Sequence, residues 1–150
     1  MVYVTGCDVV PNSYGSSAFY RWNGAAFAPL SSPGHGSAIA TLAGTSYTIG
    51  GDAMLYSSNN DGAWVKRTTP SYQPITDIGA DRAGIWIITS QVSGNGDGNA
   101  IYRRNGYNDL IDMQGAGKTV ALDTASNAWA ITNNGEIWRR SDHTAAGTPL

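Results

Sequence analysis

The stretch "AIYRRNG" at residues 100–106 decides the fold, because three other parts of the chain repeat its pattern. The related stretches are "AFYRWNG" at 18–24, "MLYSSNNDG" at 54–62 and "EIWRRSD" at 136–142. Consecutive aromatic anchors are separated by 36, 46 and 36 residues; they are Tyr20, Tyr56, Tyr102 and Trp138. Four copies in 150 residues indicate a repeat protein with a unit of about 40 residues.

A second aromatic residue precedes each anchor and reveals a larger period. These residues are Tyr3, Tyr47, Trp86 and Trp129, and their distances to the anchors alternate between long and short. Positions 82 residues apart then match: Tyr20 with Tyr102, Asn23 with Asn105, Gly24 with Gly106, Tyr47 with Trp129, Ile49 with Ile131 and Tyr56 with Trp138. We infer that a pair of small units was itself duplicated.

Each small unit is predicted to fold as four short antiparallel strands. Runs of β-branched and aromatic residues are separated by Gly, Asn, Asp and Pro, and "NG" pairs at 23–24, 105–106 and 134–135 suit tight hairpins. Four strands repeated about every 40 residues are typical of a β-propeller blade. We therefore expect an all-β protein, a single propeller domain over 1–150 with about four four-stranded blades. The blades are expected at about 1–33, 34–70, 71–115 and 116–150, and the ring closes either within the chain or by oligomerisation.

Composition and charge exclude several classes of protein. The formal net charge of −2, with only 13% charged residues, gives no basic face for nucleic acid. No apolar run approaches the length of a membrane-spanning helix, so we expect no membrane insertion. The N-terminal "MVYVTGCDVV" has no signal-peptide pattern, which leaves a virion-associated protein or release without a signal sequence open. Cys7 is the only cysteine and is expected to be a small buried apolar residue.

Short motifs resemble known propeller repeats. "NAWAITNNGEIWRR" at 127–140 is similar to a tectonin-type repeat, in which W-x-I/V is followed by a Gly turn and I-Y/W-R-R. "LYSSNNDGAW" at 55–64 resembles the Asp-box S-x-D-x-G-x-T-W of sialidase-like propellers, although Asn60 replaces the Asp and Trp64 comes one residue early. The tectonin resemblance implies a non-enzymatic lectin or recognition module, and similar small propellers also occur in phage and viral particles.

No motif points to catalysis, a cofactor or a metal. "GAGKT" at 115–119 lacks the first glycine of a phosphate-binding loop and precedes a predicted strand. His35 and His143 have no nearby ligand cluster, and "SGNGDGN" at 93–99 lacks the spaced acids of a calcium loop. Asp109 and Asp112 suit a solvated strand edge better than a catalytic pair. We expect no enzyme, no cofactor and no metal site.

The repeated aromatic and polar residues are the candidate ligand-binding set. An aromatic ring suits the C–H face of a sugar, and neighbouring Arg or Asn side chains suit its hydroxyl groups. The alternative is that the rings fill the core between blades while arginine stems cover them. The candidate residues are Tyr20, Arg21, Trp22, Tyr102, Arg103, Arg104, Trp138, Arg139 and Arg140.

Two functions remain, and each has its own partner. The first is a recognition module that binds glycans through repeated shallow sites. The second is a structural block of a virion or other assembly, which works as a homo-oligomer or with other protein chains.

Four structural expectations follow from the repeat. Tyr102 and Trp138 should be largely buried at equivalent places. The insert at 90–99 should project as an exposed loop. When the chain is aligned with itself at an offset of 82 residues, the first strand of the third small unit, at 74–80, falls before Met1. The first small unit, at about 1–33, should therefore lack one strand. A poorly patterned strand is expected at the C-terminal "TAAGTPL".

Overall fold

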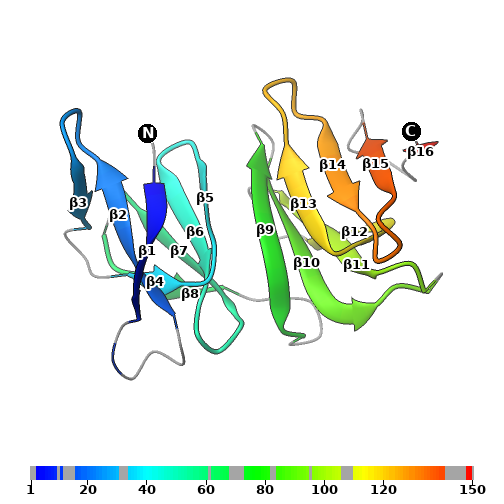
Figure 1. Cartoon of the computed structure of the whole chain (residues 1–150), viewed down its shortest axis with the longest axis horizontal. Coiled ribbons are helices and arrows are strands. Elements are labelled where there is room, and N and C mark those ends of the chain that lie inside the picture. The colour runs from blue at the N-terminus through cyan, green and yellow to red at the C-terminus, as the bar shows by residue number, and fades with distance from the viewer. Residues whose placement is uncertain are drawn as a thin grey trace. The chain divides into compact units, whose positions relative to one another are not determined.

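The computed structural model describes residues 3–9, 11, 16–30, 34–60, 62–67, 73–81, 84–94, 96–105, 110–140 and 148–149. These residues form sixteen strands and no helix, in four antiparallel sheets of four strands each. The prediction of an all-β protein built from four four-stranded antiparallel sheets is confirmed. The chain divides into two compact units, 1–67 and 68–150, called here the first and second units (Figure 1).

Each unit holds two sheets. Sheet 1 contains β1 (Tyr3–Val9), β2 (Ser17–Trp22), β3 (Phe27–Pro29) and β4 (His35–Gly36). Sheet 2 contains β5 (Ile39–Leu42), β6 (Thr45–Ile49), β7 (Leu55–Asn59) and β8 (Val65–Lys66). Sheet 3 contains β9 (Ile75–Asp81), β10 (Gly84–Val92), β11 (Asn99–Asn105) and β12 (Leu110–Gly117). Sheet 4 contains β13 (Thr119–Leu122), β14 (Ala128–Ile131), β15 (Ile137–Arg140) and β16 (Thr148–Pro149).

The strand registers show that the two units are copies. In sheet 1, Tyr3 pairs with Arg21, and in sheet 3, Trp86 pairs with Arg103. In both sheets the regular pairing is then interrupted at the same place. The interruption lies between Thr5 and Val9 in β1 and between Ile88 and Val92 in β10. In sheets 2 and 4 the partners agree at an offset of 82, as Tyr47 with Ser57 and Trp129 with Arg139 illustrate. The expected C-terminal strand is present as the short β16, which pairs with β15.

Sheet 1 differs from sheet 3 at its outer side. β2 pairs with β3 through Tyr20–Trp22 and with β4 through Ser17 and Ala18, on the same side. In sheet 3 the continuous strand β12 covers the whole of this side. Three residues of β12, at 113–115, lie opposite the single residue Ile101, which makes a bulge. The break between β3 and β4 lies opposite Phe19, the position that matches Ile101.

Sheet 1 also differs at its inner side. Each of the other three sheets begins, in chain order, with a strand that pairs with the second strand of that sheet. These first strands are β5, β9 and β13. β1 occupies the second place, and within the described residues β2 is its only strand partner. Within the described residues, sheet 1 therefore has no strand at the place that β9 holds in sheet 3. Cys7 lies on β1 and is exposed, so the expectation that it is buried is wrong.

The buried positions are not the predicted anchors. Tyr20, Tyr56, Tyr102 and Trp138 are all only partly buried. In three of the four repeats the residue before the anchor is the buried one, namely Phe19, Leu55 and Ile101. Strand geometry explains why the observed burial differs from the predicted one. Neighbouring side chains point to opposite faces, and the apolar residue before the anchor takes the inward face.

In each unit the two sheets pack face to face, and we call this packing the seam. In the second unit β13 lies beside β9 (Figure 1), and the seam holds Trp86, Ile88, Ile101, Met113, Val120, Ala128 and Ala130. Asp77 on β9 accepts hydrogen bonds from the hydroxyl of Thr119 (2.6 Å) and the backbone N–H of Val120 (2.7 Å) on β13. In the first unit the rings of Phe19 and Trp64 pack together, with centroids 5.6 Å apart.

Candidate functional site

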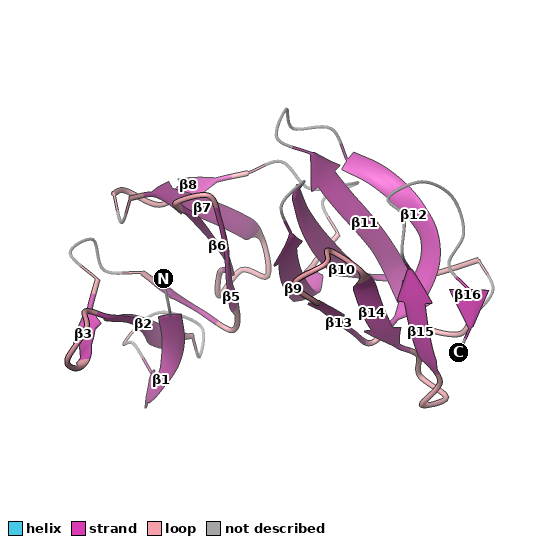
Figure 2. Ribbon diagram, turned by 90° about the horizontal axis from the view of Figure 1, so that it is seen from above, coloured by secondary structure: helices cyan, strands magenta, loops and turns pink. Residues whose placement is uncertain are grey.

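The seam of the second unit contains a cavity of about 320 Å³ that is partly open to solvent. Figure 2 shows the two sheets that form this seam from above. The lining residues are Trp86, Asp97, Ile101, Met113, Gln114, Gly115, Ala116, Val120, Ala128, Ala130, Thr132, Trp138, Arg139 and Arg140. Most of the lining is apolar, and the polar groups converge from three segments: the turn after β10, the bulge of β12, and strand β15 with the turn before it. A concave apolar pocket with a few convergent polar groups is the usual form of a small-molecule site.

One lining residue of the cavity is smaller than its counterpart in the matching seam. Ile101 stands where the first unit has Phe19, at the same place in the strand ladder. In the first unit the Phe19 ring packs against the Trp64 ring. An Ile in place of a Phe leaves volume at this position of the second seam.

Arg140 fixes one wall of the cavity. It is buried, and its Nη1 donates a 2.7 Å hydrogen bond to the backbone oxygen of Met113 in the bulge of β12. This bond ties sheet 4 to sheet 3, and a charged donor in such a setting makes a strong hydrogen bond. Arg140 therefore shapes the pocket.

Trp138 and Arg139 occupy the same strand as Arg140 but remain accessible. The Trp138 indole N–H donates to Glu136 Oε2 at 3.3 Å, which orients the ring. The Arg139 guanidinium lies 5.7 Å from the centre of the Trp129 ring, within cation–π range. Side chains alternate along β15, so Trp138 shares the seam face with Arg140, whereas the Arg139 guanidinium lies with Trp129 on the other face of sheet 4.

The turn after β10 closes another side of the cavity. The backbone N–H of Asn133, in the turn before β15, donates to the backbone oxygen of Asp97 at 2.9 Å. Asp97 also lines the cavity. β10 itself extends to Val92, so the expected free loop at 90–99 is partly strand and partly a turn that packs on sheet 4. The expectation that it projects as an exposed loop is wrong for Asp97.

The other predicted site residues lie elsewhere. Arg103 and Arg104 are each 6% exposed, and the Nε of Arg103 is buried with no hydrogen-bond partner in the structure. Tyr102 lies on the face of β11 opposite Ile101; burial and, next, the Asp112 carboxylate raise its pKa. Tyr20, Arg21 and Trp22 belong to the first unit, where the Trp22 ring, 43% exposed, packs edge-on against Phe27.

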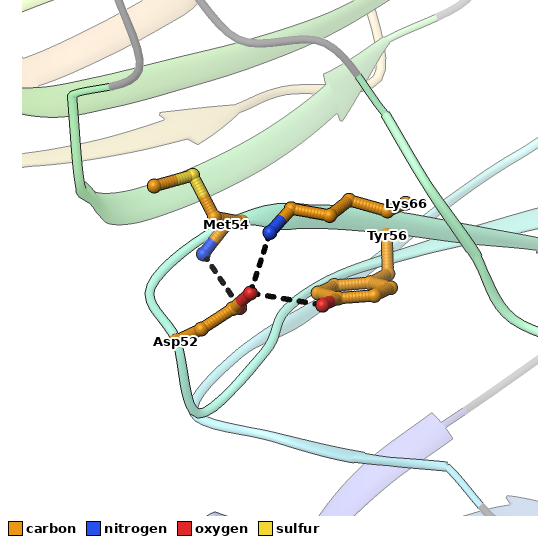
Figure 3. A network of polar contacts seen from close by, with 4 residues as sticks. All are labelled: Asp52, Met54, Tyr56 and Lys66. Atoms are coloured by element: carbon orange, nitrogen blue, oxygen red, sulfur yellow. Dashed lines mark hydrogen bonds and ion pairs between the residues drawn. The ribbon is translucent and has the colours of Figure 1, made fainter.

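A second polar cluster surrounds Asp52 in sheet 2 (Figure 3). The Asp52 carboxylate accepts bonds from Lys66 Nζ (2.8 Å), the Tyr56 hydroxyl (2.9 Å) and the backbone N–H of Met54 (3.1 Å). Burial opposes ionisation of Asp52, but the hydrogen bonds from Lys66 and Tyr56 outweigh it and lower its pKa. All of its hydrogen bonds come from its own sheet, so we assign it to the closure of the β6–β7 turn.

Several lining residues had no clear signal in the sequence. Gln114 has a positive φ of 50°, and its N–H donates to Asp112 Oδ1 at 2.7 Å. Such a left-handed residue depends on the bulge, which in turn depends on pairing with β11. The sequence shows Trp86 as a repeated aromatic residue. That its ring borders a pocket depends on the small side chains packed around it, which strand pairing brings together.

Comparisons with known proteins add no identity. No protein-family model and no curated protein sequence matches the chain. Among the described residues, no group of three or more His, Cys, Asp or Glu side chains could hold a metal ion. The same residues contain no helix long and apolar enough to cross a membrane.

Proposed function

We propose that this protein is a non-enzymatic recognition module that binds a glycan in the seam cavity of the second unit. The observation that carries the proposal is a cavity of about 320 Å³ whose lining includes two indole rings and several polar side chains. Sugars present an apolar C–H face and a fringe of hydroxyl groups. Trp86 and Trp138 match the first, and Gln114 and Asp97 match the second.

The tectonin-like segment supports the same ligand class. The motif at 127–140 supplies several of the lining residues, among them Trp138 and Arg139. Tectonin-like propellers are often lectins, so the resemblance and the geometry converge on one part of the chain. Fold likeness alone does not transfer a function, and the cavity is the stronger support.

The acidic side chains favour binding over catalysis. Asp77, Asp112 and Asp123 each accept a hydrogen bond from a backbone N–H group. Carboxylates committed to such bonds serve to hold turns and sheets together. They are poorly placed to act as a pair of general acid and base.

The test is a cavity-filling substitution taken from the first unit. Ile101→Phe introduces the residue of the matching seam, so we expect the protein to fold and to lose glycan binding on an array and by calorimetry. Trp138→Ala should weaken binding at least about tenfold. Trp22→Ala is the matched control in the other unit, and its binding should be unchanged. If Ile101→Phe bound glycans as well as the wild type, the cavity would not be the site.

An assembly role is the second candidate, and the edge of β1 favours it. Within the described residues only one side of β1 is paired, and an open edge invites a strand from another chain. On this hypothesis the protein is a block of a virion or another particle and forms a homo-oligomer or docks on a partner chain. Light scattering is the test. A stable monomer at micromolar concentration, with slow amide exchange at 4–8, would contradict the hypothesis.

A further inference from the structure

A second hollow lies on the other face of β11 and β12. Its volume is about 290 Å³, and its polar lining includes Gln91, Ser93, Tyr102 and Asp112. The Tyr102 hydroxyl is 3.4 Å from Gln91 Oε1. Side chains of odd and even number on β11 point to opposite faces, so Ile101 borders the seam cavity while Tyr102 borders this second hollow.

The two hollows meet at the bulge of β12. Gln114 and Gly115 line both of them. The bulge holds Gln114 in a left-handed conformation, with its N–H bonded to Asp112, and its side chain is exposed. A strained residue that the surrounding structure maintains at the junction of two hollows is a common feature of binding sites.

The two hollows differ in chemistry in a complementary way. The seam cavity offers two indole rings and apolar side chains, whereas the second hollow offers amide, hydroxyl and carboxylate groups. One ring stacked on an indole, followed by a ring held through its hydroxyl groups, would use both surfaces.

We propose that the ligand is a linear oligosaccharide of at least two sugar units, with one ring in each hollow. The linkage between the rings crosses the edge of sheet 3 at Gln114 and Gly115. The inference rests on the proposed glycan binding and adds the ligand's minimum length and its path.

The experiment compares affinity for ligands of different length. Calorimetry is carried out on the full chain with mono-, di- and tetrasaccharides of the sugar that binds best on the array. We expect the disaccharide to bind about tenfold tighter than the monosaccharide, because two or three added hydrogen bonds contribute about that much. The double variant Gln91→Ala/Tyr102→Phe should reduce this ratio to near one and leave monosaccharide affinity unchanged.

Variants at the junction give a second readout. Gln114→Gly suits the positive φ but removes the amide side chain, and we expect it to lower the disaccharide-to-monosaccharide ratio. Gln114→Asn keeps an amide and tolerates the same backbone conformation, so it should retain part of the ratio.

The outcomes separate the two proposals. Equal affinity for all lengths, or a ratio that the Gln91→Ala/Tyr102→Phe variant does not change, overturns the two-hollow ligand and leaves the seam site standing. Binding that survives Ile101→Phe, or no binding of any glycan, overturns the proposed function and this inference with it.

Discussion

The first and second units repeat one strand ladder, yet they bury different amounts of it. Thr5 and Ile88 occupy the same register position, opposite Phe19 and Ile101, but Thr5 is exposed and Ile88 is fully buried. The difference follows from the neighbours. β10 is flanked by β9 and β11, whereas β1 has one described partner. Burial therefore depends on the position of a strand in its sheet as well as on its sequence.

The seams of the two units also differ, in the residues that meet there. In the first unit two aromatic rings pack together, and in the second a hollow is lined by Trp86, Trp138 and small side chains. At one register position the two seams thus differ in kind, because Phe19 packs against a second ring in the first unit, whereas Ile101 borders a pocket in the second. The predictions that follow test the comparison in order of expected effect.

The largest effect is expected from truncating the matched residues of β10 and β1. Ile88→Ala removes a fully buried side chain and should lower the free energy of unfolding by about 2–5 kcal/mol. Thr5→Ala, at an exposed position, should change it by less than about 0.5 kcal/mol. Chemical denaturation of both variants measures the difference. Equal losses would mean that the two strands are equally enclosed.

The next effect concerns Asp77, which lies on β9, the strand with no counterpart among the described residues of sheet 1. Asp77→Ala leaves the N–H of Val120 without its acceptor, and the cost should be about 1–3 kcal/mol. Thr119→Ala removes only the hydroxyl bond and should cost about 0.5–1.5 kcal/mol. Denaturation curves of the two variants should rank in this order. The reverse order would show that the bond to the backbone of β13 does not hold the seam.

A smaller effect is expected from the turn at 93–98. Replacing it with Asn-Gly removes the acceptor of the Asn133 N–H and should cost about 0.5–1.5 kcal/mol, together with glycan affinity. Asp97→Ala keeps the backbone oxygen, so it should leave the melting temperature unchanged. A shortened protein as stable as the wild type would show that the contact between the turn and Asn133 contributes nothing.

The smallest effect is an acid transition at Asp123, in the turn between β13 and β14. The Asn127 side chain, the Asn127 backbone N–H and, more weakly, the Trp129 indole donate to its carboxylate and lower its pKa from 3.8 to about 2. Because the folded pKa lies below the unfolded one, this contribution is complete above pH 3.8 and is lost as the pH falls through about 2.

The Asp123 transition can be followed by NMR. The Asn127 and Trp129 side-chain N–H signals should shift in that acid window, and Asp123→Asn should abolish the shift. The corresponding turn of sheet 2 closes instead with Ala43 and Gly44 at positive φ, so its signals should not move with it. A Trp129 signal that titrates near pH 4 would show that the bonds do not form.

Much of the fold could be predicted from the sequence, because the repeat places large residues at fixed intervals. Tyr20 with Tyr102 and Tyr56 with Trp138 were enough to find the duplication and the missing strand. The choice of buried residues was less accessible, since Ile101 and Tyr102 are both apolar enough to be buried and only the orientation of the sheet decides between them. The seam cavity could not be predicted, because it depends on Phe19 and Ile101 at equivalent positions in different surroundings.

The site residues show the same division. Trp138, Arg139 and Arg140 were found from the motif, and all three line the cavity. Gln114 and Asp97 come from the bulge of β12 and the turn after β10. Pairing across strands brings them to the cavity, and no local pattern in "DMQGAG" or "SGNGDGN" predicts that position.

The shared irregularity of the two ladders also dates events in the history of the chain. β1 and β10 both carry two additional residues at the same point, opposite β2 and β11 respectively. A fault that both copies inherited must already have been present in the ancestral half-chain before it was doubled. The aromatic pair Phe19–Trp64 in one copy and the hollow around Trp138 in the other are a difference between the copies, so at least one of them changed after that doubling. The ladder is thus the older record in this protein, and the contrast between the two seams is the later one.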